Sequence, residues 1–268
     1  MTPTDLDLAT LDRIVPEILR EAGEIALRYF RTAIVAENKG GERGFDPVTE
    51  ADRGIEDLIS SRLSERFPDH QVTGEERGTT GLDGRYRWTI DPIDGTKSFV
   101  SGSPLWGILV GLLDGDVPVA GWVHQPYLDE TFAAVGGQAT LTHAGATRPM
   151  RSRQSSTLDT SVMYTTFPGS FRPGRELDIL GRLSASVRLV RYGGDCYSYC
   201  MIALGHVDLV IETGLAPYDI VPIIPIVTAA GGVVTGLDGQ PAASGGLVVA
   251  AANATLHDQV LAAIAEFR

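Results

Sequence analysis

The chain has 268 residues, of which 43% are hydrophobic, and its formal net charge at pH 7 is −12. A chain of this length and composition can bury a sizeable core, so we expect an ordered globular protein. The acidic balance argues against a nucleic-acid-binding protein, because no basic surface is available to neutralise a phosphate backbone.

The N-terminal quarter predicts two helices joined by a loop. Apolar residues recur every three or four positions over about residues 5–33, which indicates an amphipathic helix. The polar, glycine-rich segment 37–44 is typical of either a flexible connector or a lid. Thr49 is placed to cap a second helix that continues to about residue 67. Asp52, in the first turn of that helix, is an acid that would complement the helix dipole.

Five strands are predicted next, near 71–73, 86–90, 106–113, 118–124 and 130–135. The Asp114-Gly115-Asp116 turn predicts an antiparallel hairpin between the third and fourth of them. The segment at about 137–160 is polar and rich in Gly, Ser and Thr. We interpret it as the boundary between an N-terminal lobe, residues 1–145, and a C-terminal lobe, residues 146–268.

Strands and helices alternate in the second lobe, a pattern typical of layered α and β elements. The predicted strands lie near 161–165, 187–192, 207–212, 232–236 and 246–250, and the predicted helices near 175–184, 195–205, 218–230 and 254–267. Cys196 and Cys200 are four residues apart on one face of a predicted helix. We therefore interpret them as core residues rather than as a disulfide or redox pair.

The most informative segment is Asp91-Pro-Ile-Asp94-Gly95-Thr96, which directly follows the apolar strand at 86–90. Two carboxylates are delivered together at the end of a strand, where loops meet solvent. Mg²⁺ prefers such oxygen ligands, commonly together with substrate phosphate oxygens and water. Gly95 and Thr96 open a predicted helical turn whose free N–H groups could hold a phosphate. Taken alone, an Asp-Pro pair could also cap a turn.

The acidic motifs together resemble those of a known family. The chain holds Asp46-Pro-Val-Thr-Glu-Ala-Asp52, Gly74-Glu75-Glu76, the Asp91–Thr96 motif, and Tyr218-Asp219 before a helix ending in Ala229-Ala230-Gly231-Gly232. In order and across nearly the whole chain, these motifs resemble the signatures of the inositol monophosphatase family of Mg²⁺-dependent, lithium-sensitive phosphomonoesterases. The resemblance implies an α/β/α/β/α layered sandwich of two intimately packed lobes, a metal site at their junction, and a homodimer.

The resemblance also implies which oxygen atoms hold two or three Mg²⁺ ions. Glu75, Asp91 and the main-chain carbonyl of Ile93 would bind the first ion. Asp91, Asp94 and Asp219 would bind the second. Glu75 would in addition face a more weakly held third ion through water.

The same resemblance implies the catalytic roles. Asp52 and Thr96 would orient and help deprotonate the attacking water, and Glu75 would support them through the metal. Two ions about 3.5–4 Å apart can activate water and stabilise the leaving oxygen. The N–H groups of Gly95 and Thr96 would add fixed dipoles around the phosphoryl group. An aspartyl nucleophile at Asp91 is chemically conceivable, but the resemblance favours direct in-line attack by water.

The substrate-binding part of the chain departs from the inositol phosphatase pattern. Asp195 stands where those proteins usually have a small or hydroxylic residue, and Tyr218 replaces the usual Trp. Pro225 lies inside the helix that follows, and Lys97 follows Gly-Thr. These departures resemble the histidinol-phosphate phosphatase branch of the family.

Histidinol phosphate carries an ammonium group and an imidazole, and a cationic ester favours extra carboxylates near the phosphate. Asp195 and Glu212 are predicted to supply them, and Tyr197 could stack on the imidazole. Asp195 could instead be only the N-cap of the next helix. The chain would then be an inositol-1-monophosphatase or a broad sugar and nucleotide phosphatase. A non-catalytic metal-binding interaction module with the same fold is a third alternative.

The expected partner is a small phosphorylated metabolite, with no nucleic acid and no membrane. Neither a signal peptide nor an apolar run of about 18 residues is present in the sequence, which leads us to expect a cytoplasmic protein.

Overall fold

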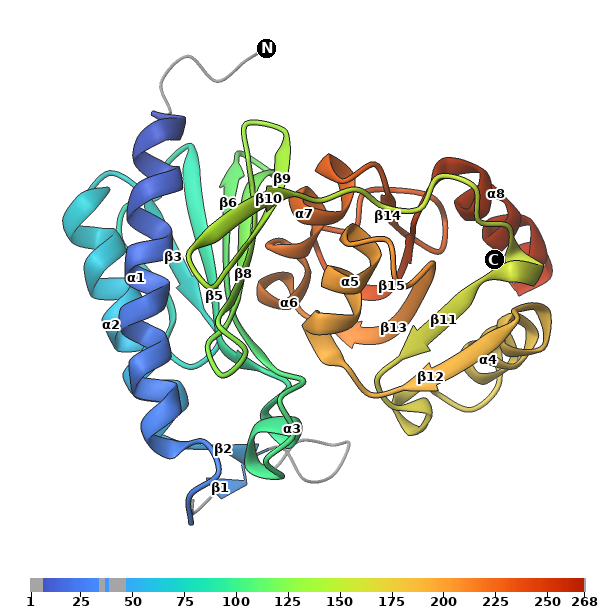
Figure 1. The fold of residues 1–268 in the computed structure, drawn as a ribbon, viewed down its shortest axis with the longest axis horizontal. Helices are drawn as coiled ribbons and strands as arrows, with labels where there is room; N and C mark the ends of the chain where they lie inside the picture. Colours follow the sequence, from blue (N-terminus) through green and yellow to red (C-terminus); the bar gives the residue numbers. More distant parts are fainter. Residues whose placement is uncertain (1–6, 34–36, 39–46, 268) are drawn as a thin grey trace.

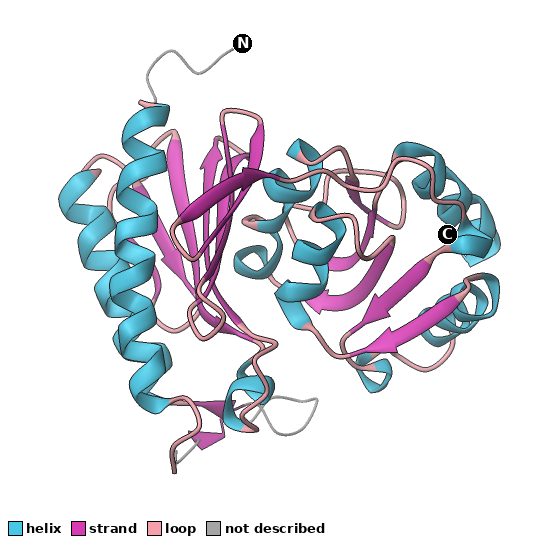
Figure 2. Cartoon of the chain, viewed as in Figure 1, coloured by secondary structure: helices cyan, strands magenta, loops and turns pink. Residues whose placement is uncertain are grey.

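Two large β-sheets and three layers of helices alternate through the described part of the molecule (Figures 1 and 2). The computed structural model describes residues 7–33, 37–38 and 47–267. The layers run in the order helix, sheet, helix, sheet, helix. The predicted α/β/α/β/α sandwich is therefore confirmed.

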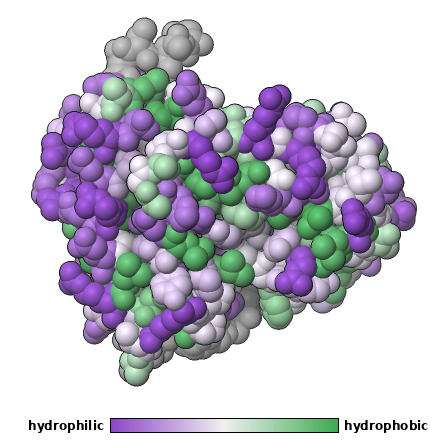
Figure 3. All heavy atoms as spheres, in the orientation of Figure 1, coloured by the Kyte–Doolittle hydropathy of each residue, from purple (hydrophilic) through white to green (hydrophobic). Residues whose placement is uncertain are grey.

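The outer helical layer on one side consists of α1 (Leu8–Tyr29) and α2 (Glu50–Arg66). Thr49 caps α2 as predicted, with its side chain accepting the N–H of Ala51. Figure 3 shows hydrophilic residues over most of the surface on this side of the molecule. The inward faces of both helices are buried and mainly apolar, and α2 also buries two carboxylates there, those of Asp52 and Glu56. Of the predicted loop at 37–44, only β1 (Glu37–Asn38) is described, paired with β2 (Pro47–Val48), so the lid hypothesis lies outside the described residues.

The first sheet has eight strands in the order β10-β9-β8-β7-β6-β5-β3-β4. They are β3 (Gln71–Gly74), β4 (Gly78–Thr80), β5 (Tyr86–Asp94), β6 (Gly107–Asp114), β7 (Val117–Gln125), β8 (Glu130–Val135), β9 (Gln138–His143) and β10 (Ala146–Pro149). The predicted hairpin is present as the antiparallel β6–β7 pair. Among the described strands of this sheet, only β3 and β5 pair in parallel, which places their C-terminal ends at the same edge. The short helix α3 (Thr96–Val100) follows β5.

The second sheet has five strands in the order β12-β11-β13-β15-β14. They are β11 (Val162–Thr165), β12 (Leu189–Tyr192), β13 (Leu209–Leu215), β14 (Val233–Gly236) and β15 (Gly246–Ala251). Between the sheets lie α5 (Asp195–Ala203), α6 (Pro217–Ile220) and α7 (Ile223–Ala229), and outside the second sheet lie α4 (Arg175–Ser186) and α8 (Ala254–Ala263) (Figure 1). Three short 3₁₀ turns span Leu158–Thr160, Pro168–Ser170 and Ala265–Phe267.

Consecutive strand residues point to opposite faces of a sheet. Each sheet can therefore bury apolar side chains against a helical layer on either side. Ile108 and Val110 of β6 pack with α1 and α2, whereas Leu109 packs toward the middle helices. In the second sheet, Val210 faces the middle helices and Leu209 faces α4 and α8. The middle helices therefore join both sheets into one body. Cys196 and Cys200 are buried free thiols in this layer, as predicted.

One predicted helix differs from the structure, and the segment at about 137–160 contains strands that were not predicted. The segment interpreted as a polar boundary forms β9 and β10, which extend the first sheet, and the chain crosses to the second sheet between β10 and β11. The lobe division at residues 145 and 146 stays a prediction. The helix predicted at 218–230 is two helices, α6 and α7, separated around Pro222. Proline has no N–H to donate to a preceding turn, so it interrupts the helical hydrogen bonds. Among the described residues, no helix is both long and apolar enough to cross a membrane.

Candidate active site

A β-bulge in β5 brings the first two acids together. Asp91 pairs with Leu109 of β6, and Asp94 pairs with Gly107, so β5 has one residue more than β6 in this interval. In a regular strand, residues three apart point to opposite faces, and one extra residue reverses that relationship. Pro92 lies in the bulge and lacks an N–H that a regular ladder would need. The irregular strand end therefore lets both carboxylates serve one site.

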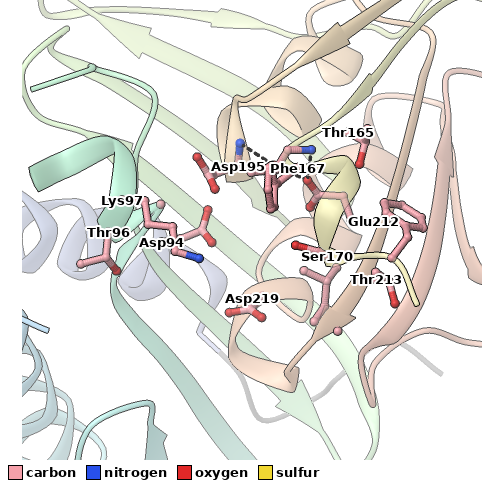
Figure 4. Close-up of a pocket in the computed structure, with 15 residues that line it drawn as sticks. Asp94, Thr96, Lys97, Thr165, Phe167, Ser170, Asp195, Glu212, Thr213 and Asp219 are labelled. Atoms are coloured by element: carbon pink, nitrogen blue, oxygen red, sulfur yellow. Dashed lines mark hydrogen bonds between the residues drawn. The ribbon is translucent and has the colours of Figure 1, made fainter. Parts of the chain in front are cut away.

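Asp219 completes a three-carboxylate cluster from the other part of the chain. It lies in α6, directly after β13, and its Oδ2 accepts the N–H of Ala216 at 2.7 Å. One oxygen each from Asp91, Asp94 and Asp219 lies within 4.8 Å of the others. Figure 4 shows Asp94 and Asp219 facing the same cavity. The structure thus brings together three predicted ligands that are distant in sequence.

Glu75 lies next to this cluster because β3 and β5 are parallel. Gly74 pairs with Ile90, and the N–H of Glu75 donates to the Ile90 carbonyl at 3.2 Å. Burial raises the pKa of Asp91 well above its usual value, and the nearby Glu75 charge raises it further. Glu75 also raises the pKa of Asp219, after burial. Glu75 is therefore electrostatically part of the cluster.

The cluster's chemistry fits a hard divalent cation. Burial raises the pKa of Asp94, and the charge of Asp219 raises it further. Several acids thus share a small buried volume that disfavours their negative charges. Carboxylate oxygens are the donors that hard cations prefer, and a bound cation would relieve this repulsion. The residues present therefore fit a metal site.

The proposed water-orienting pair is engaged in local hydrogen bonds. Asp52 is buried, and its Oδ2 accepts the Thr49 N–H at 2.8 Å and the Thr49 hydroxyl at 2.5 Å, which completes a capping box. Burial raises the pKa of Asp52 to about 6. The Thr96 hydroxyl donates to the Ile93 carbonyl at 3.0 Å, and the Ile93 N–H donates to Asp91 Oδ1 at 3.1 Å. Asp52 therefore takes part in capping α2, in the first turn where the sequence predicted an acid that complements the helix dipole.

Glu56 supports the segment that carries Glu75, and sequence reasoning did not identify it. Its buried carboxylate accepts the N–H of Glu76 at 2.7 Å and of Arg77 at 2.8 Å. Burial raises the pKa of Glu56, although these two hydrogen bonds oppose the effect. Glu56 is one helical turn after Asp52, so its spacing on the buried face of α2 was the available signal.

A cavity of about 620 Å³ opens beside the cluster. Residues from both sheets line it, including Asp94, Gly95, Thr96, Lys97, Asp195, Glu212 and Asp219 (Figure 4). Gly95 has φ 82° and precedes α3, so it occupies the left-handed conformation that glycine adopts easily. The predicted substrate-binding residues Gly95, Thr96, Asp195 and Glu212 therefore share one cavity.

Asp195 does not cap α5. The cap position belongs to Gly194, and no side chain caps the helix. Asp195 has φ 44°, which is uncommon for a residue with a side chain. Its Oδ2 accepts the Ser98 hydroxyl at 3.1 Å. Burial raises the pKa of Asp195, and the charge of Asp94 raises it further. The carboxylate is therefore directed toward the acidic cluster rather than toward its own helix.

Thr166 joins Glu212 to the start of α5. The Thr166 N–H donates to Glu212 Oε1 at 3.0 Å, and the Thr166 hydroxyl donates to the same oxygen. That hydroxyl also accepts the N–H of Asp195 at 3.0 Å. The Tyr199 hydroxyl donates to Glu212 Oε2 at 3.1 Å, and burial raises the pKa of Glu212 to about 7. The sequence contained no signal for the bridging role of Thr166.

Tyr197 is not brought to the cavity. Its hydroxyl donates to Glu130 at 2.6 Å, and its ring packs edge-on against Phe132 of the first sheet. Residues two apart in a helix do not share a face, so Tyr197 points away from the side of α5 that presents Asp195. Phe167, which we did not predict, lines the cavity instead.

Comparison with known proteins identifies sequence relatives of this chain. The sequence profile of the inositol monophosphatase family matches residues 7–268. A histidinol-phosphatase of Streptomyces coelicolor is 41% identical, covering 80% of this chain and 82% of that protein. An inositol-1-monophosphatase of Synechocystis is 33% identical, and the match covers 97% of this chain and 90% of that protein.

Solved structures agree with these sequence relatives. An inositol monophosphatase from Zymomonas mobilis superposes with a TM-score of 0.84 at 31% identity, covering 96% of this chain and 99% of that chain. The fold, the acidic cluster and the family match across nearly all described residues point to one assignment. The chain belongs to the inositol monophosphatase family of metal-dependent phosphatases that act on small phosphorylated substrates.

Proposed function

We propose that this protein is a Mg²⁺-dependent histidinol-phosphate phosphatase, which hydrolyses the ester to histidinol and phosphate by in-line attack of water. We also expect the active form to be a homodimer, as the family resemblance implies. Its mass in solution, measured by light scattering, tests that second expectation.

The observation that carries the proposal is the placement of Asp195. Its half-buried carboxylate lies beside Asp94 and is free of a capping role, because Gly194 occupies the cap position of α5. Glu212 lines the same cavity and is linked to Asp195 through Thr166. Two carboxylates beyond the proposed metal ligands favour a leaving group that carries positive charge. An inositol ring offers only neutral hydroxyl groups.

The relative from Streptomyces coelicolor, a histidinol-phosphatase at 41% identity, supports the same substrate. A second candidate function is inositol-1-phosphate hydrolysis or a broader phosphatase activity. The inositol-1-monophosphatase relative, which matches 97% of this chain, favours it. The two candidates share the metal site and differ in how the leaving group is recognised.

Different residues of the site have different roles in the proposed reaction. Asp91, Asp94, Asp219 and Glu75 would hold Mg²⁺, which would supply positive charge to the phosphoryl oxygens and favour ionisation of water. The N–H groups of Gly95 and Thr96, at the start of α3, would donate to the phosphate. Asp52, with its pKa raised by burial to about 6, would accept a proton from the attacking water. The Thr96 hydroxyl would help to orient that water.

Steady-state kinetics with two esters test the proposal. In the presence of Mg²⁺, we expect kcat/KM for histidinol phosphate to be well above kcat/KM for inositol 1-phosphate. A higher kcat/KM for inositol 1-phosphate would favour the second candidate. No phosphate release from a panel of small esters would instead indicate a non-catalytic metal-binding module.

A further inference from the structure

The cavity has an aromatic wall that the metal chemistry does not use. Among the described residues that line it, Phe167 is the large hydrophobic side chain that remains exposed, at 60% of its surface. Phe171, which also lines the cavity, is buried in the core of the second sheet. An exposed aromatic ring at the edge of a substrate cavity is available to contact a ligand.

The residue next to Phe167 is hydrogen-bonded to the carboxylate of Glu212 and to the main-chain N–H of Asp195. Thr166, its neighbour in the chain, donates twice to Glu212 and accepts the N–H of Asp195. The position of the aromatic residue is thereby coupled to the position of both acids. Figure 4 shows Phe167, Asp195 and Glu212 together around the cavity.

The ring itself rests on the 3₁₀ turn that follows. A Cβ added at Gly169 would lie 2.5 Å from Cε1 and 2.6 Å from Cζ of Phe167, closer than such atoms can approach. Glycine at 169 therefore leaves the space that one edge of the ring occupies. The Phe167 ring is supported on one side and exposed on the other.

The charges around this ring define the chemistry of its ligand. Asp94, Asp195, Glu212 and Asp219 contribute four acidic groups to the described lining, and Lys97 contributes one basic group. The face of an aromatic ring attracts cations and stacks with flat rings. A flat ring that carries positive charge satisfies both the aromatic face and the carboxylates.

We propose that Phe167 is a specificity-determining residue whose ring stacks on a flat, cationic nitrogen heterocycle in the leaving group of the ester, with Asp195 and Glu212 as its charge partners. The inference rests on the proposed function, because imidazole is the heterocycle of histidinol phosphate. It assigns to Phe167 the stacking role that the sequence suggested for Tyr197.

Product inhibition separates the ring from the rest of the substrate. Histidinol carries the amino alcohol and the imidazole, whereas alaninol carries the amino alcohol without a ring. Each is tested as an inhibitor of glycerol 2-phosphate hydrolysis by the full chain in Mg²⁺. We expect Phe167→Leu to raise the inhibition constant of histidinol about tenfold and that of alaninol less than twofold, since only histidinol can stack.

Two further variants serve as rescue and control. Phe167→Tyr keeps the aromatic face, so the inhibition constant of histidinol should return to within about twofold of the wild-type value. Tyr192→Leu removes an aromatic side chain that is 57% exposed but lies outside the cavity lining, and it should leave both inhibition constants unchanged.

The outcomes distinguish this proposal from the proposed function. An unchanged inhibition constant of histidinol in Phe167→Leu, or an equal rise for histidinol and alaninol, would overturn the role of Phe167. This holds even if histidinol phosphate proves to be the best substrate. Conversely, selective loss of histidinol inhibition would support the ring site even if another ester were hydrolysed faster.

Discussion

A side chain at position 74 would occupy the space of the Glu56 carboxylate. A Cβ built on Gly74 would lie 2.1 Å from Glu56 Oε1 and 2.3 Å from its carboxyl carbon. Glu56 in turn accepts the N–H groups of Glu76 and Arg77. The close approach of α2 to the end of β3 therefore holds the turn that presents Glu75 to the acidic cluster.

Gly74→Ala should displace Glu56 and loosen this turn. We expect the Mg²⁺ concentration for half-maximal activity to rise at least tenfold, because Glu75 would no longer be held beside Asp91. Activity titrated against Mg²⁺ measures the effect. Gly181→Ala is the matched control, since a Cβ at Gly181 meets nothing within 4 Å and alanine favours the helix. A normal Mg²⁺ requirement in Gly74→Ala would show that the turn does not depend on Glu56.

Removing a carboxylate of the cluster should remove the activity without unfolding the protein. Asp94→Asn deletes one charge and one predicted ligand, so kcat should fall by several orders of magnitude. Asp116→Asn is the control, because the Asp116 side chain is 99% exposed in a turn.

Chelation of the metal should abolish turnover by the wild-type protein, and millimolar lithium should inhibit that turnover. Full turnover after exhaustive chelation would exclude the metal mechanism.

Asp52 and Thr96 should act on one water molecule. Asp52→Asn and Thr96→Ala should each lower kcat. The fold-reduction in kcat of the double variant should be much smaller than the product of the fold-reductions of the two single variants. The four kcat values form a double-mutant cycle. Independent, multiplicative losses would mean that the two residues act separately, in keeping with their distinct hydrogen bonds to Thr49 and Ile93.

The pKa of Asp52 should make stability depend on pH. Burial raises this pKa from 3.8 to about 6, so the folded state binds the proton more tightly than the unfolded state. The resulting stabilisation is fully present below pH 3.8 and is lost as pH rises through about 6. It amounts to about 3 kcal/mol at 1.36 kcal/mol per pKa unit.

Urea unfolding between pH 4 and 7, in the presence of a chelator, measures this dependence. The free energy of unfolding should fall more steeply with rising pH for the wild type than for Asp52→Asn, which cannot ionise. Parallel pH profiles for the two proteins would contradict the raised pKa.

Asp195→Asn tests the basis of substrate selection. We expect KM to rise far more for histidinol phosphate than for glycerol 2-phosphate, because a lost negative charge matters most to a cationic ester. A charge-assisted hydrogen bond of about 1.5–3 kcal/mol corresponds to roughly a 10- to 150-fold change. Equal changes for both esters would move the assignment to the broader phosphatase.

Much of the fold could be predicted because local patterns and tertiary structure agree. The apolar spacing in α1 and the capping residue Thr49 each carry a local signal for the element observed. β9 and β10 were missed because their polar, Thr-containing sequences resemble a loop, and their pairing with the first sheet decides their structure. Pro222 was not recognised as the break between α6 and α7.

The candidate site was likewise predicted in part from the sequence. Asp91 and Asp94 are identifiable from their motif, whereas the bulge that brings them together depends on pairing with β6. Glu56 and Thr166 act through hydrogen bonds to residues far away in sequence. The helical spacing of Glu56 indicates only that it lies on the buried face of α2, and no local pattern marks Thr166. Tyr197 was chosen for its residue type, and helical geometry places it on the other face of α5.

The acidic cluster draws on both sheets, and this has a consequence for folding. Asp91 and Asp94 end a strand of the first sheet, while Asp219 follows β13 of the second. Contacts between residues so distant in sequence form after local ones, because closing a long loop costs entropy. A cation held by all three carboxylates would bind only after the two sheets have docked. Such an ion would lengthen the lifetime of the folded state without speeding its formation.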